Sequence, residues 1–365
     1  MRLTRNSHGE YVALNGLKYN PEHYFFGGKY TLTTDEGIEY EIDARSGDLL
    51  QVKDLNGNTL NYSDAGIVSS TGVEVKFERD AEGRISKVID PAGEEIRYNY
   101  DEKGDLVSVV DREGNETKYY YENEERAHYL TRVEDPLGRE GIRVEYGEDG
   151  RLSRTIDVNG EAVELIYDTD SQTQVVKDLY GKETFYVYDQ NGNITQEIQP
   201  SGLKIERTYD QNQVTSETVY TAESGSEGWE TTYEYDHWGN LLKETDTLGN
   251  TIHYTYGKYN RLFSETDALG NTTTYKYDAR GNLTSSVDAL GNETKYTYGL
   301  GGQLFTLTDA QENTTHFDYD YRGNVTKVID AEGNVTEYEY DSYGNRTLER
   351  RKDVTQPDGS KKDII

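Results

Sequence analysis

The stretch Tyr233–Asn250, YEYDHWGNLLKETDTLGN, decides the fold because it returns almost unchanged along the chain. The copies that follow read YTYGKYNRLFSETDALGN, YKYDARGNLTSSVDALGN, YTYGLGGQLFTLTDAQEN and FDYDYRGNVTKVIDAEGN, and a partial copy begins at Tyr338. The second aromatic residue of each copy advances by 21 residues every time, through Tyr235, Tyr256, Tyr277, Tyr298, Tyr319 and Tyr340. A fixed period of this length is the signature of a repeat architecture.

Each copy contains two turn motifs of the same kind, 236–240 and 246–250. An aspartate at the first position and a glycine at the fourth favour a type I turn followed by a left-handed residue, which is a common β-hairpin connection. The segments between turns alternate with period two: Ile252, Tyr254 and Tyr256 share one face. The sequence therefore predicts short antiparallel strands and no long helix.

The predicted fold is an all-β repeat protein, a long antiparallel β-strip. One face of the strip carries Leu, Ile, Val and Tyr and the other Thr, Lys, Glu and Ser, so we expect it to coil until the apolar face is covered or enclosed. The alternative topology is a parallel β-solenoid with one coil per repeat. The Asp-x-x-Gly reversals favour the antiparallel strip.

The repeat divides the chain into three parts. Residues 1–29 do not fit the period and are expected to be an N-terminal cap or the end of a preceding repeat. Residues 30–348 form the repeat array, with insertions near 122–128 and 222–230. Residues 349–365 carry mixed charges and are expected to be a frayed tail.

Composition excludes several classes of function. A net charge of −31 argues against nucleic acid and against anionic membrane surfaces as partners. The absence of cysteine excludes disulfides, thiolate catalysis and cysteine-based metal sites. No apolar stretch is long enough for a membrane span, and residues 1–10 lack a signal-peptide core, so we expect either a cytoplasmic chain or a piece of a larger exported protein, without membrane insertion. Repeats that start near the first residues and run almost to the last favour the piece.

The motif Y-x-Y-D-x-x-G-N-L followed by D-x-x-G-N-x-T, repeated over about residues 30–348, resembles the tyrosine–aspartate (YD) repeats of bacterial Rhs proteins. Such repeats also occur in wall-associated proteins, in toxin-complex components of insect pathogens and in teneurins. The resemblance implies a β-strip that spirals into a hollow shell. In the toxin relatives the shell encloses a C-terminal toxic domain, and in teneurins it is extracellular and serves adhesion.

The resemblance does not extend to autoproteolysis. In toxin relatives a core-associated domain after the repeats releases the toxin with catalytic aspartates. After Arg350 nothing remains that could form such a domain. The segment Asp135–Arg139, DPLGR, resembles part of that domain's motif but stands where a repeat turn is due, and we interpret it as a turn.

No catalytic, cofactor-binding or metal-ligating residue is predicted, no cofactor is expected, and we do not expect an enzyme. The histidines show no metalloprotease-like spacing; they are His8, His23, His128, His237, His253 and His316. Asp236 and Asp246 could be mistaken for a glycosidase pair, but the same two turn aspartates recur along the repeats. Ca²⁺ binding by stacked turn carboxylates and sugar stacking on tyrosine ladders remain open alternatives.

The expected function is that of a non-catalytic structural segment. It would form part of the wall of an Rhs-type shell that encapsulates a C-terminal toxin or effector domain in a larger secreted or cell-surface bacterial protein. The expected partners are neighbouring domains of a longer chain and the enclosed toxin, with surface glycans as a further possibility. The alternative is an extracellular adhesion or carbohydrate-binding module acting through exposed tyrosine faces.

Overall fold

The computed structural model describes residues 4–5, 11–12, 18–20, 27–221, 226–355 and 361–365. Within this part of the chain the secondary structure is short β-strand, with a 3₁₀ turn, η2, at Lys258–Asn260 and no α-helix. The strands in chain order are β1 (Thr4–Arg5), β2 (Tyr11–Val12), β3 (Lys29–Thr33), β4 (Glu39–Asp43), β5 (Leu49–Lys53), β6 (Thr59–Ser63), β7 (Gly66–Ser69), β8 (Glu74–Arg79), β9 (Ile85–Ile89), β10 (Glu95–Tyr100), β11 (Leu106–Val110), β12 (Glu116–Tyr120), β13 (Arg132–Glu134), β14 (Glu140–Tyr146), β15 (Leu152–Asp157), β16 (Ala162–Asp168), β17 (Thr173–Lys177), β18 (Glu183–Tyr188), β19 (Ile194–Ile198), β20 (Lys204–Asp210), β21 (Gln213–Tyr220), β22 (Trp229–Tyr235), β23 (Leu241–Thr245), β24 (Thr251–Tyr256), β25 (Leu262–Thr266), β26 (Thr272–Tyr277), β27 (Leu283–Val287), β28 (Glu293–Tyr298), β29 (Leu304–Thr308), β30 (Thr314–Tyr319), β31 (Val325–Ile329), β32 (Val335–Tyr340), β33 (Arg346–Thr355) and β34 (Lys361–Ile364).

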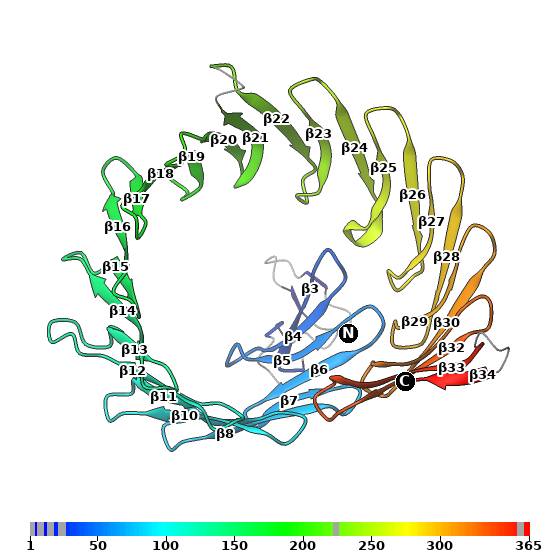
Figure 1. Ribbon diagram of the computed structural model, residues 1–365, viewed down its shortest axis with the longest axis horizontal. Helices are drawn as coiled ribbons and strands as arrows, with labels where there is room; N and C mark the ends of the chain where they lie inside the picture. The colour runs from blue at the N-terminus through cyan, green and yellow to red at the C-terminus, as the bar shows by residue number, and fades with distance from the viewer. Residues whose placement is uncertain (1–3, 6–10, 13–17, 21–26, 222–225, 356–360) are drawn as a thin grey trace.

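Strands β3 to β34 form one antiparallel sheet of 32 strands, in which each strand pairs with its neighbours along the chain. Among the described residues β3 pairs only with β4 and β34 only with β33, so the sheet is an open ribbon and not a closed barrel. The predicted antiparallel strip is confirmed, and the parallel solenoid is wrong. The ribbon curls through a full revolution, with β3 to β6 inside the ring that the later strands form (Figure 1).

The turns are held by their aspartates. In a representative turn, Asp288 Oδ1 accepts the backbone N–H groups of Leu290 at 2.9 Å and of Asn292 at 2.8 Å, and its Oδ2 accepts Asn292 Nδ2 at 2.7 Å. Gly291 has φ of 86°, a left-handed conformation that costs glycine little. The turn therefore satisfies its own backbone donors and reverses the chain within five residues, as the sequence predicts.

Each repeat contains a hairpin that opens toward one end. Strands β25 and β26 are paired only beside their turn. The pairs run from Thr266 with Thr272 to Ser264 with Thr274, and no residues farther from the turn are paired. Tyr277 bridges the opening, because its hydroxyl donates to the carbonyl of Leu262 at 2.9 Å. The same bond, to a carbonyl 15 residues earlier, is made by Tyr100, Tyr121, Tyr209 and Tyr340. The second tyrosine of the repeat thus closes the wide end of the hairpin.

A β-bulge lies beside the same tyrosine. The register between β26 and β27 shifts at Lys276/Tyr277, and the equivalent shift recurs at Thr255/Tyr256 and Thr297/Tyr298. A bulge increases the local twist and bends its strand. A bulge at the same place in successive repeats therefore bends the ribbon in the same sense, which accounts for its regular curvature.

The ribbon is one layer thick. The accessible surface is 23587 Å², whereas a compact monomer of 41.6 kDa would expose about 15,000 Å². Among the described residues Ile156 is the only large hydrophobic side chain that is buried. Cohesion therefore depends on backbone pairing and on cross-strand side-chain pairs, such as the 2.9 Å hydrogen bond between the hydroxyls of Thr266 and Thr272.

The C-terminal segment differs from the expected frayed tail. Strand β33 pairs with β32 on one side and with β34 on the other, and only residues 356–360 lie outside the described residues. The mixed charges form cross-strand ion pairs, Arg350–Glu337 at 3.8 Å and Lys352–Asp363 at 3.4 Å. The mixed charges of β33 and β34, which suggested an unstructured end, therefore lie on paired strands at the C-terminal end of the sheet. Most of the predicted N-terminal cap lies outside the described residues.

The tyrosine bond can be tested with Tyr277→Phe. The variant leaves the half-buried Leu262 carbonyl without its donor, which costs about 1 kcal/mol. We expect faster hydrogen exchange in β25 and β26, measured by mass spectrometry. The matched control is Tyr180→Phe, at a ring that is 78% exposed. Equal exchange in both variants would contradict a role for the bond.

The turn aspartates predict acid sensitivity. Hydrogen bonds from Asn292 and from backbone amides lower the pKa of Asp288 from its ordinary 3.8, and Asp246, Asp267 and Asp330 behave alike. A lowered pKa contributes stability that is complete above the unfolded value and is lost as pH falls through the folded one. We expect strand structure, followed by circular dichroism in dilute solution, to be lost only below about pH 3.8. Loss already complete near pH 5 would contradict this cause.

Candidate functional site

The two long edges of the ribbon are rows of turns. The tyrosine edge consists of the turns that follow the second tyrosine of the repeat, for example 101–105, 278–282 and 341–345, together with turn 80–84, which follows Arg79 at the same position. The leucine edge consists of the alternating turns, for example 54–58, 90–94, 246–250, 267–271 and 288–292. Because successive strands are antiparallel, the two rows lie on opposite sides of the strip.

The ribbon closes on itself along a seam between these edges. Asn56, on the leucine edge, exchanges side-chain hydrogen bonds of 2.9 and 3.2 Å with Asn282, on the tyrosine edge, 226 residues away. Asn58 Nδ2 donates to the carbonyl of Gly301 at 3.0 Å, across 243 residues. These separations correspond to about eleven 21-residue repeats per revolution.

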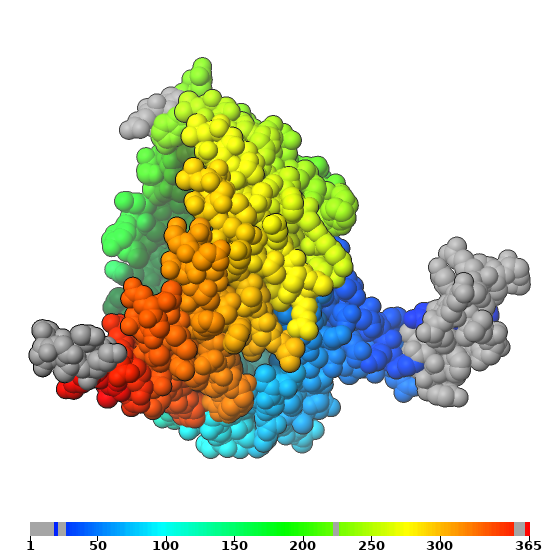
Figure 2. Space-filling model, turned by 90° about the vertical axis from the view of Figure 1, so that its right-hand side faces the viewer, coloured from blue at the N-terminus to red at the C-terminus, as the bar shows by residue number. Residues whose placement is uncertain are grey.

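The seam continues through charged and aromatic groups. A hydrogen bond to the Glu94 carboxylate raises the pKa of Tyr343. The guanidinium of Arg112 lies 5.4 Å from the Tyr343 ring centroid and donates to Asp90 Oδ2 at 3.1 Å. The C-terminal half lies against the N-terminal strands along this line (Figure 2). In this stretch the seam joins acidic turns and Arg112 of the first winding to Tyr343 of the last.

Lateral bonds tie the tyrosine edge together where it forms the seam. Arg280 Nη1 donates to the Leu300 carbonyl at 3.0 Å, and Arg322 Nη1 donates to the Ser342 carbonyl at 2.6 Å. Each arginine therefore links its own turn to the next turn of the row. Close approach also matters here, because a Cβ on Gly302 would lie 2.6 Å from Asn56 Nδ2.

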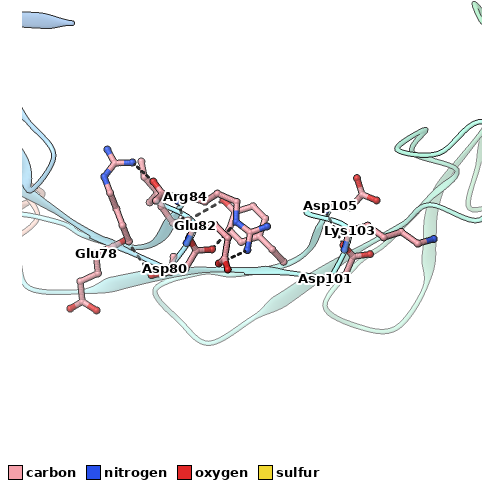
Figure 3. Close-up of polar contacts among 12 residues, drawn as sticks. Glu78, Asp80, Glu82, Arg84, Asp101, Lys103 and Asp105 are labelled. Carbon is pink, nitrogen blue, oxygen red and sulfur yellow. Dashed lines mark hydrogen bonds and ion pairs between the residues drawn. The ribbon is translucent and has the colours of Figure 1, made fainter. Parts of the chain in front are cut away.

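In the first winding the tyrosine edge carries several acidic side chains, among them Asp80, Glu82 and Asp101 (Figure 3). Asp80 Oδ2 accepts Arg84 Nε at 2.7 Å, and Asp101 Oδ1 accepts the backbone N–H groups of Lys103 and Asp105 at 2.9 Å. These carboxylates are occupied by their own turns. They do not converge on a common centre.

The insertion between β12 and β13 bridges turns of this edge. His128 Nδ1 lies 2.7 Å from Asp105 Oδ1, and Arg126 donates to the carbonyl of Glu148 in a later turn. Asp105 is buried, and its Oδ2 has no partner among the described residues. The insertion therefore covers part of the first tyrosine edge, a placement that its polar sequence does not reveal.

The other histidines are scattered. His237 stacks on Trp238 with ring centroids 3.5 Å apart, His253 is exposed on β24, and His316 lies 6.2 Å from the Phe305 ring. His8 and His23 lie outside the described residues. Over the described ranges, no group of three His, Asp or Glu side chains could hold a metal ion.

The other candidate motifs lie in turns. Asp236 and Asp246 lie on opposite edges of the strip, and each accepts hydrogen bonds from its own turn. Asp135 Oδ1 accepts the N–H groups of Leu137 and Arg139, so the DPLGR segment forms a repeat turn. In the part of the chain that is described, no helix has the length and apolarity needed to cross a bilayer.

Asn282→Ala tests the seam. The substitution removes the bonds to Asn56 and also the turn bond to Asp278, whereas Asn292→Ala removes only the equivalent turn bond to Asp288. We expect hydrogen exchange in residues 54–58 to quicken by about tenfold in the first variant alone. An equal effect of both variants on this segment would show that the seam bond contributes nothing.

Comparisons with known proteins agree with this architecture. The teneurin YD-shell family model matches residues 28–162. The RHS repeat model matches residues 220–251, 235–272, 258–292, 277–314 and 319–361. No curated protein sequence matches the chain.

Solved structures of similar fold belong to much longer chains. The crystal structure of TcdB2-TccC3 matches with a TM-score of 0.60 and 14% identity, over 96% of this chain and 23% of that one. The TcdB2-TccC3-Cdc42 crystal structure gives 0.60 and 14%, over 89% and 20%. A Photorhabdus luminescens Tc holotoxin pore gives 0.59 and 14%, over 89% and 21%. The chain therefore spans about a fifth of the length of these proteins.

The two family models describe repeats of one kind and together account for most of the ribbon, including both sides of the seam. In the structure these repeats appear as the 21-residue period, as the tyrosines that close several of the hairpins and as the two edges that pair in the seam. The chain belongs to the Rhs/YD-repeat family.

Proposed function

We propose that this chain is a non-catalytic wall segment of an Rhs-type shell. In this role it encloses a C-terminal toxin or effector domain within a larger secreted or cell-surface protein. Its partners are the neighbouring domains of that protein and the enclosed domain.

The observation that carries the proposal is the seam. Contacts between Asn56 and Asn282 and between Arg112 and Tyr343 turn a single-layer ribbon into a continuous curved wall. About 22 strands per revolution, spaced at about 4.8 Å, give a circumference of at least about 105 Å. Such a wall encloses space. The scarcity of buried hydrophobic side chains agrees with a hollow, single-layer wall that has no central core.

The adhesion and carbohydrate-binding alternative has weaker support. The tyrosines that recur in the repeats are half-buried, and several use their hydroxyls to close hairpins. Sugar stacking requires free aromatic faces. Exposed rings such as Trp238 and Tyr321 are isolated along the tyrosine edge and do not form a continuous platform.

Protection of a passenger tests the wall role. A foreign mini-domain of about 30 residues, with a radius of gyration of about 8 Å, is fused after Ile365, and its cleavage by a protease is compared with that of the free domain. We expect cleavage to slow by about tenfold, because the wall limits access to the passenger.

The control fusion carries Asn282→Ala, which removes the seam bonds to Asn56 and is expected to lose part of the protection. Equal cleavage of the fused and free domains would refute enclosure by this chain. Small-angle scattering on the unfused chain reports separately whether the hollow, curved shape is present.

A further inference from the structure

Three Asn-Gly dipeptides occupy the same place in three turns of the ribbon. They are Asn56–Gly57, Asn159–Gly160 and Asn191–Gly192, and a fourth, Asn15–Gly16, lies outside the described residues. In each of the three turns the glycine has φ between 82° and 88°. Its N–H donates to the carbonyl of the turn aspartate at 3.0 to 3.2 Å. The backbones around the three asparagines are therefore closely matched.

An asparagine that precedes glycine is chemically reactive. The backbone nitrogen of the glycine attacks the side-chain carbonyl carbon, because no Cβ on that glycine obstructs the approach. The nitrogen loses its proton, a C–N bond closes a succinimide ring, and the side-chain nitrogen leaves as ammonia. Water then opens the ring at either carbonyl, which gives aspartate or isoaspartate. The reaction needs no oxidant, reductant or enzyme.

The closed seam restrains the Asn56 amide. Its Nδ2 donates to Asn282 Oδ1 at 3.2 Å, and its Oδ1 accepts Asn282 Nδ2 at 2.9 Å. A Cβ on Gly302 would lie 2.6 Å from the same Nδ2, so the facing winding also crowds the amide. Ring closure turns the side chain back onto the nitrogen of Gly57, which requires both bonds to Asn282 to break. Asn56 therefore reacts from an opened seam, at a rate that follows the population of the open form.

Asn159 and Asn191 lack this restraint. Both are exposed, and Asn159 Nδ2 donates to Asp157 Oδ2 in its own turn at 3.2 Å. Within the described ranges neither asparagine bonds to another winding. They share the turn geometry of Asn56 but not its seam bonds, so they supply reference rates inside the same molecule.

The reactive member of the seam pair is Asn56. Asn282 is followed by Leu283, whose side chain hinders attack by its backbone nitrogen, whereas Asn56 is followed by Gly57. Deamidation in the seam would therefore start at the first winding and leave its partner asparagine intact.

The product does not fit the seam. Asn282 Nδ2 donates to Asp278 Oδ2 at 3.0 Å as well as to Asn56. An aspartate at position 56 places a second carboxylate on the same amide, and like charges at close range repel. It also faces Asn282 Oδ1 without a proton to donate, because a carboxylate only accepts hydrogen bonds. Isoaspartate in addition adds a methylene to the main chain of turn 54–58, so the turn itself changes shape.

We propose that Asn56 is a spontaneous deamidation site that the closed seam protects, and that its conversion makes an opening of the seam permanent. A seam that opens briefly closes again unchanged. A seam that stays open loses the Asn56 amide as ammonia and cannot restore the bond to Asn282. The inference goes beyond the wall role and holds with or without an enclosed domain.

Peptide mapping by mass spectrometry measures the reaction at each site. The purified full chain is incubated at mildly alkaline pH, which favours deprotonation of the attacking nitrogen. We expect Asn56 to react at least about tenfold more slowly than Asn159 and Asn191. In guanidinium chloride the three rates should converge, because the seam is then lost. Equal rates in the folded chain would overturn the proposal. So would a difference that persists in denaturant, since the local sequence would then be its cause.

Opening the seam by substitution tests the protection. In Asn282→Ala we expect Asn56 to react about tenfold faster while Asn159 and Asn191 keep their rates. Asn292→Ala removes a turn bond equivalent to the one that Asn282→Ala removes at Asp278, and it should leave Asn56 unchanged. General unfolding is recognised because it would raise all three rates together. An unchanged Asn56 rate in Asn282→Ala would contradict protection by the seam.

The permanence of the opening is tested separately with Asn56→Asp, which installs the product directly. We expect hydrogen exchange in residues 278–282 to quicken by about tenfold. Asn159→Asp is the matched control, because it makes the same change in a turn without a seam bond, and it should exchange as the parent does. Parental exchange in Asn56→Asp would overturn the proposal. The passenger experiment above has no bearing on these rates, so the two proposals can fail independently.

Discussion

The structure depends on hairpins whose strands are paired at one end and separated at the other. Backbone pairing is complete beside the leucine-edge turn and stops before the tyrosine edge, as β25 and β26 show. A tyrosine long enough to span the opening satisfies the carbonyl left there, as Tyr277 does for Leu262. Without that side chain the open end would leave a polar group unpaired in a half-buried place. Repetition of this unit, together with the bulge beside its tyrosine, produces the curvature, the revolution and the seam.

The repeat also explains why so little hydrophobic core is needed. Each hairpin is held by turn aspartates, ladder hydrogen bonds and cross-strand hydroxyl or ion pairs, and it contacts mainly its two neighbours. Stability in such arrays is approximately the sum of local terms and nearest-neighbour terms. The seam adds the long-range term, since it joins residues more than two hundred positions apart.

Much of the fold is readable from the sequence because its determinants are local. Asp288 and Gly291 specify a turn, alternation specifies strands, and the 21-residue period specifies the strip. The seam is not readable, because the number of repeats per revolution depends on the bend at each bulge, which no single residue encodes. Asn56 and Asn282 look like ordinary turn asparagines. The C-terminal strands β33 and β34 were missed because their alternation is carried by charged residues, whose partners lie on neighbouring strands.

The seam has a consequence for how the array can change in length. Insertion or deletion of one whole repeat between the two sides would preserve every turn and every hairpin. It would also keep the two rows of turns facing each other, because the rows share the same period. Each specific partner would nevertheless move by one position, so that Asn56 would face a different turn from the one that holds Asn282. The turns and hairpins therefore tolerate a change in the number of repeats, whereas the side-chain pairs of the seam do not. Drift in repeat number should therefore be accompanied by substitutions at the seam turns rather than within the strands.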